Sequence, residues 1–137
     1  MRQLTIAFLS LFLSVQAFAF RDATTVSRVE QLKQRLEAEA PQNRLVHLEK
    51  FKDFMYKRLN TIEMPEDILN TPDEDPRLEE FRSLTEFSGY VNLIAPKSVS
   101  ATGCRSAHQD IVNTANTQGS EASEAVEALK ILNSLCK

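Results

Sequence analysis

The chain has 137 residues and a formal net charge of −3, with three glycines, two histidines and two cysteines. This length fits one small domain. Because glycine is scarce, a glycine-rich phosphate-binding loop has little material, and because the chain is acidic overall, nucleic acid is disfavoured as a partner. With two histidines and no C-x-x-C pair, we expect neither a metal site nor a cofactor.

Residues 1–19 have the three parts of a secretory signal peptide. A basic start precedes an apolar run over residues 4–15, and the segment ends in the small-residue pattern Ala-Phe-Ala. The run is shorter than the ~20 residues of a membrane-spanning helix. We therefore expect cleavage after Ala19, a secreted or periplasmic location, no transmembrane segment after signal removal, and one mature domain over residues 20–137.

Two amphipathic helices are predicted in the first half of this mature domain. Apolar residues recur at steps of three and four from Val26 to Leu36, and again from Leu45 to Leu59, which is the spacing of one helix face. Pro41 separates the two helices, because the residue before a proline is pushed out of the helical region.

An acidic, proline-rich loop is predicted near residues 63–76. It has room for one short helical turn, near Glu66–Leu69. Asp75 followed by Pro76 is a helix-start signature, with the aspartate as the cap and the proline at the first helical position. A third helix then runs through Ile94 and is expected to end at the next proline.

Two further helices are predicted on either side of Gly119 and Ser120, after a polar connector at residues 97–103. In an antiparallel hairpin that turns at Ser120, facing residues have numbers that add up to about 240, so Cys104 faces Cys136. An even number of cysteines in an exported protein favours a disulfide. We therefore predict an all-α fold, a small single-domain bundle of about five helices, whose C-terminal antiparallel hairpin is closed by this disulfide.

The segment around Cys104 also raises the possibility of a thiol enzyme. A thiol nucleophile needs a base within hydrogen-bond reach and a group that orients the base. His108 lies four residues further and shares a helix face with Cys104, but Asp110 points elsewhere. We therefore assign no catalytic residue and expect His108 to be a surface residue.

The second predicted helix carries the candidate interaction surface. Residues 41–62 have five basic side chains against two acidic ones, whereas residues 63–96 have nine acidic against two basic. This helix either pairs internally with the acidic third helix or meets an acidic protein partner or an anionic surface. We expect it to bury Phe51 and Met55 and to turn Lys50, Lys57 and Arg58 toward solvent. The candidate surface residues are Arg44, Lys50, Lys52, Lys57 and Arg58.

These features predict a secreted or periplasmic helical protein that acts as a macromolecular interaction or inhibitor module, without an assembled catalytic site. Two alternatives stay open. One is a carrier of apolar ligands or lipids between the phenylalanine-rich second and third helices. The other is a small hydrolase that uses His108.

Overall fold

The computed structural model describes residues 22–94, 99–118 and 123–137, and every regular element within these ranges is helical. The helices are α2 (Ala23–Ala38), α3 (Arg44–Thr61), α4 (Pro76–Asn92), α5 (Ala101–Gln118) and α6 (Ser123–Leu135), with the 3-10 turns η1 (Pro41–Asn43) and η2 (Ile68–Asn70). The predicted all-α class is confirmed. The third predicted helix, α4, ends at Asn92 rather than running through Ile94, because the last turn tightens and the N–H of Ile94 donates to the carbonyl of Val91 at 3.0 Å. The expected signal peptide and the turn at Gly119–Ser120 lie outside the described residues.

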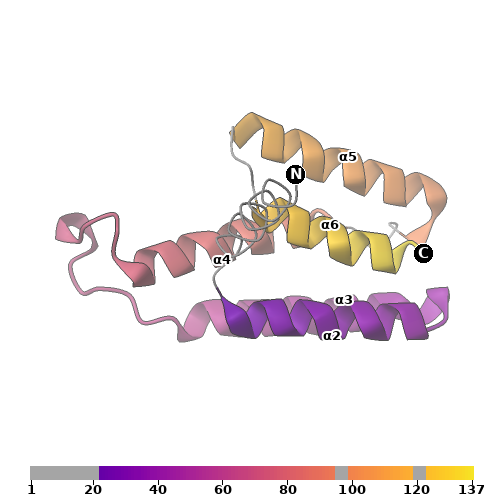
Figure 1. Cartoon of the computed structure of the whole chain (residues 1–137), viewed down its shortest axis with the longest axis horizontal. Coiled ribbons are helices and arrows are strands. Elements are labelled where there is room, and N and C mark those ends of the chain that lie inside the picture. The colour runs from indigo at the N-terminus through magenta and orange to yellow at the C-terminus, as the bar shows by residue number, and fades with distance from the viewer. Residues whose placement is uncertain (1–21, 95–98, 119–122) are drawn as a thin grey trace, which may run out of the picture.

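Four of these helices form a bundle around the core (Figure 1). α3 packs against α2 and α4, and α6 packs against the same two helices from the other side. α5 lies outside this bundle and packs mainly on α6. The last two helices therefore form a hairpin in which α6 belongs to the four-helix bundle and α5 adds Ala107 and Ile111 to the core from outside it.

On α2 and α3 the core consists of the apolar stripes that the helical spacing indicated, whereas on α6 Val126 is 54% exposed and Ala125, Ala128, Ile131 and Leu135 are buried instead. Phe51 and Met55 are 5% and 1% exposed, which confirms their predicted burial. The ring of Phe51 meets the ring of Phe87 on α4 edge to face, with centroids 6.1 Å apart, an arrangement that aromatic pairs favour. The other large buried side chains include Leu36, Leu48, Leu84, Tyr90, Ile111, Ile131 and Leu135.

Two helix starts show how well local signals predicted the boundaries. Asp75 caps α4 as expected, because its carboxylate accepts a hydrogen bond of 2.9 Å from the backbone N–H of Arg77. α5, however, begins at Ala101, inside the segment expected to be a polar connector. The side chain of Ser100 accepts a 3.0 Å hydrogen bond from the N–H of Gly103, so this serine caps the helix earlier than the apolar spacing indicated.

The predicted disulfide is present and closes the C-terminal hairpin. Cys104, in the first turn of α5, is bonded to Cys136, just after the end of α6, with Cα atoms 6.1 Å apart. The two helices are therefore antiparallel. α5 buries Ala107 and Ile111 against the rest of the molecule, while His108 is exposed, as expected.

Among the residues that the structure describes, no helix is both long and apolar enough to span a bilayer.

Candidate functional site

The five basic residues of the candidate surface do not lie on one surface. Arg44 is 7% exposed. Its guanidinium donates to the carbonyl oxygens of Ser134 and Leu135 at the end of α6, at 3.4 and 3.1 Å, and to that of Glu39 at 3.1 Å. The last carbonyls of a helix have no partner within the helix. Arg44 therefore joins the start of α3 to the end of α6.

Arg58, which was expected to face solvent, is instead half-buried, because its guanidinium makes contacts within the molecule. Its guanidinium lies 2.7 Å from a carboxylate oxygen of Glu80 on α4 and 3.3 Å from one of Asp22, beside the start of α2. Burial alone would raise the pKa of Asp22, but hydrogen bonds from Thr25 and Arg58 and the charge of Arg58 outweigh it and hold that pKa below its usual value. Here α3 does pair with the acidic α4, which was the internal alternative for its charges.

Lys52 and Lys57 also have partners within the molecule. The ammonium of Lys52 donates to the carbonyl oxygen of Ile94 at 3.2 Å. That of Lys57 lies 2.9 Å from the carboxylate of Asp53, one turn before it. Lys50 is different, because within the described part of the chain it has neither an ion pair nor a hydrogen bond to its ammonium.

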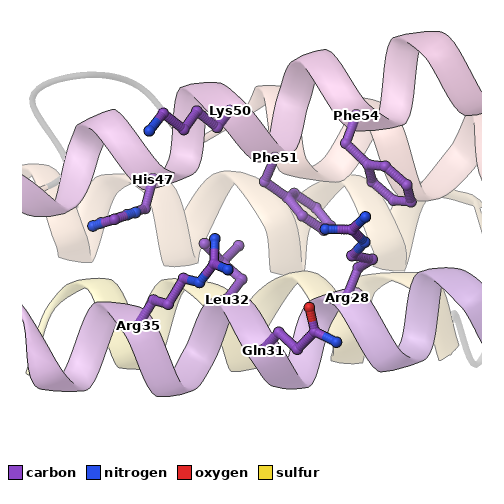
Figure 2. Close-up of a pocket in the computed structure, with 8 residues that line it drawn as sticks. All are labelled: Arg28, Gln31, Leu32, Arg35, His47, Lys50, Phe51 and Phe54. Atoms are coloured by element: carbon purple, nitrogen blue, oxygen red, sulfur yellow. The ribbon is translucent and has the colours of Figure 1, made fainter.

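Lys50 lies at the rim of a hollow of about 70 Å³ between α2 and α3, which we call the α2–α3 groove (Figure 2). The groove is lined by Arg28, Gln31, Leu32 and Arg35 from α2 and by His47, Lys50, Phe51 and Phe54 from α3. The residues of α2 recur at steps of three and four, so they lie along one face of the helix. The groove therefore follows from the pairing of two helix faces.

The floor of the groove is apolar and aromatic. Leu32 and Phe51 are buried and Phe54 is half-buried, with the two rings 6.0 Å apart between centroids. Arg28 reaches from α2 toward these rings (Figure 2), and its guanidinium carbon is 5.0 Å from the centroid of Phe54. This is a cation–π contact, which holds the Arg28 charge at the mouth of the hollow.

The rim of the groove carries positive charge that the described residues do not neutralise. Arg28, Arg35 and Lys50 are all exposed, and none of them has a carboxylate partner in the described ranges. Three cations beside one hollow repel one another and attract an anion.

His47 and Glu39 mark the end of the groove near η1. The Nε2 atom of His47 is 3.0 Å from a carboxylate oxygen of Glu39, and this hydrogen bond is the main reason why the pKa of Glu39 is lowered. The Nδ1 atom of His47 is buried and has no hydrogen-bond partner among the described residues. His47 therefore has one unused polar atom beside the groove.

Arg28 and Arg35 were not among the predicted site residues. In the sequence they belong to a helix of mixed charge, and their only signal is the i, i+3, i+7 spacing of Arg28, Gln31 and Arg35. That spacing puts the three residues on one helix face. The sequence gives no indication that Lys50 of α3 lies beside them, because this depends on how the two helices pack.

The region around Cys104 does not assemble a catalytic set in the described residues. Cys104 is bonded to Cys136, so it offers no thiolate. His108 is exposed on α5, and no described side chain hydrogen-bonds to its ring. The described residues also contain no group of three metal-ligating side chains.

No protein-family model, curated protein or solved structure matches this chain.

Proposed function

We propose that the protein is an exported helical module that binds an acidic segment of a partner protein in the α2–α3 groove. The observation that carries this proposal is a set of three cations, Arg28, Arg35 and Lys50, that have no carboxylate partner among the described residues and lie beside a hollow with an aromatic floor. Export is supported by the signal-like residues 1–19 and by the disulfide, since disulfides are rare in reducing compartments.

The charge distribution favours a short acidic segment over an extended anionic surface. The chain as a whole is negative, so a bilayer or a nucleic acid, which presents negative charge over a wide area, meets repulsion from the rest of the molecule. A short segment experiences mainly the local field of the groove, because charges farther away than about 8–10 Å are screened at physiological salt.

The carrier alternative, a cavity between α3 and α4, has less support from the described residues. Between α3 and α4 the rings of Phe51 and Phe87 are already in contact. The hydrolase alternative has no described partner that would orient His108.

The proposal is tested by site-specific photo-crosslinking in cells that export the protein. A photoreactive amino acid replaces Gln31, which lines the groove, and in a control variant it replaces Gln109, an exposed glutamine on α5. We expect a protein adduct from position 31 and none from position 109. Charge reversal at Arg28 and Arg35 should remove the adduct.

Two results would contradict the proposed site. One is the same pattern of adducts from positions 31 and 109. The other is an adduct at position 31 that survives Arg28→Glu with Arg35→Glu, because binding would then not depend on the groove charges.

A further inference from the structure

The loop between α3 and α4 presents two apolar side chains to solvent. Ile68 and Leu69, which we call the tip, belong to η2 and are 53% and 97% exposed. The loop over residues 63–75 extends beyond the end of the bundle (Figure 1). These two apolar side chains are therefore accessible to a partner that could bury them.

The tip is surrounded by negative charge. Glu66, Asp67, Asp73 and Glu74 are exposed, and in the described ranges none of them has a basic partner. Asp67 holds the turn by accepting a 2.6 Å hydrogen bond from the side-chain amide of Asn70. The loop is therefore an acidic element with an apolar end.

The same chain thus carries two surfaces of opposite character. Within the described residues, the groove combines three cations that have no carboxylate partner with an apolar floor, and the loop combines four carboxylates that have no basic partner with an apolar tip. Complementary charge selects the partner, and burial of an aliphatic side chain on an aromatic floor adds affinity.

We infer that the acidic loop of one copy docks in the α2–α3 groove of a second copy, with Leu69 on the aromatic floor and the loop carboxylates facing Arg28, Arg35 and Lys50. The inference rests on the proposed function, since it names the acidic segment that the groove binds. The loop extends beyond the end of its own bundle (Figure 1). Its tip can therefore enter the groove of a second copy without bringing the helices of the two bundles into contact.

This contact is heterologous, because it joins two different surfaces. Such a contact produces a ring or an open chain of copies. A single loop buries less surface than the ~1,200 Å² of a standard interface, so we expect weak, micromolar-or-weaker association. The ionic part is screened by salt, so association should weaken as the ionic strength rises toward about 1 M.

The test is analytical ultracentrifugation of the exported protein and three variants. The tip variant is Leu69→Asp, and the groove variant is Arg28→Glu with Arg35→Glu. The matched control, Arg82→Glu with Arg105→Glu, makes the same charge change at two exposed arginines outside the groove. Circular dichroism checks that each variant is folded, which the exposure of all five positions favours.

We expect the average mass of the wild-type protein and of the control to rise with concentration. The tip variant and the groove variant should each stay monomeric. A mixture of these two should form a 1:1 complex that stops at two chains, because only one intact tip and one intact groove can meet.

The inference is overturned if the wild-type protein stays monomeric up to about 1 mM, a concentration that detects even weak contacts. It is also overturned if either variant still self-associates or if their mixture forms no complex. If the wild-type protein is monomeric and the photoreactive residue at position 31 crosslinks to a different protein, a second copy is not the occupant of the groove, but the proposed function is unaffected. A Gln31 adduct with the chain's own loop in the same molecule overturns the inference as well.

Discussion

Arg44 was expected on the surface from the sequence, but in the fold its side chain is buried and links two helices. It stands at the polar start of α3, where the spacing of apolar residues gives no reason for burial. Its partners, the carbonyls of Ser134 and Leu135, are about 90 residues further along the chain. The sequence therefore predicts its charge but not its place, because the contact exists only once α3 and α6 have packed.

Replacing Arg44 by methionine should destabilise the fold. The substitution keeps the aliphatic stem and removes the guanidinium, which leaves carbonyl oxygens of α6 without a donor. Hydrogen bonds to charged groups contribute about 1.5–3 kcal/mol, so we expect a loss of about 2–3 kcal/mol in the free energy of unfolding, measured by urea denaturation. The control Lys50→Met should change stability by less than ~0.5 kcal/mol, and equal losses in both variants would refute the structural role.

Asp22 should make stability depend on pH. Its pKa in the folded state is below its usual value of 3.8, so its ion pair with Arg58 contributes stability above the unfolded pKa and loses that contribution as the pH falls through the folded pKa. We expect the Tm of Asp22→Asn to lie below that of the wild type from about pH 5 to 7, and the two to converge toward about pH 2. A Tm difference that is constant over this range would mean that the carboxylate charge is not the cause.

At the scale of elements, the packing of α5 relies mainly on one neighbouring helix. It packs mainly on α6 and buries Ala107 and Ile111, whereas α6 itself contacts α2 and α4 as well. The bond between Cys104 and Cys136 ties the start of α5 to the end of the chain. We therefore expect α5 to be the helix that loses order first when this bond is removed.

Removing the disulfide should lower stability by about 3–4 kcal/mol in the chain-entropy model, because the bond restrains the unfolded chain. The variant is Cys104→Ser with Cys136→Ser, the measurement is urea denaturation, and hydrogen exchange should show the amides of α5 exchanging fastest among the helices. His108→Ala serves as the control and should leave both measurements unchanged. Two reactive thiols in freshly exported wild-type protein would contradict the account.

The elements themselves were largely predictable from local patterns. The Asp75–Pro76 start of α4 and the facing of Cys104 with Cys136 are confirmed, because capping and hairpin register depend on residues close to the turn. The start of α5 was missed, since Ser100 stands in a stretch of small polar residues that looks like a connector. An apolar stripe marks only the part of a helix that is buried, and the first turn of α5 has little to bury.

At the scale of the whole molecule, the groove was not predictable. It combines Arg28 and Arg35 from α2 with Lys50 from α3, and each helix alone has an ordinary mixture of charges. Of the five predicted surface residues, Lys50 is the one that lines the groove. The rotation of α2 relative to α3, which decides which polar faces meet, is a result of core packing between Leu32, Phe51 and their neighbours.

The proposed export concerns the whole chain and has a direct test. If residues 1–19 are a signal peptide, N-terminal sequencing of protein recovered from the exported fraction should begin at Phe20. The physical reason is the small-residue pattern that ends at Ala19. A mature protein that still begins at Met1 would contradict cleavage.

The most direct test of the central claim, that the α2–α3 groove receives an acidic segment with an apolar anchor, is an NMR titration of the ¹⁵N-labelled exported protein. The probe is a synthetic peptide of residues 63–75, and the control peptide has Leu69 replaced by aspartate. We expect amide shifts to cluster at residues 28–35 of α2 and 47–54 of α3, to be absent from α5, and to vanish with the control peptide or with Arg28→Glu and Arg35→Glu in the protein. Saturating shifts centred on α5, or no shifts at all up to about 1 mM peptide, would contradict the claim.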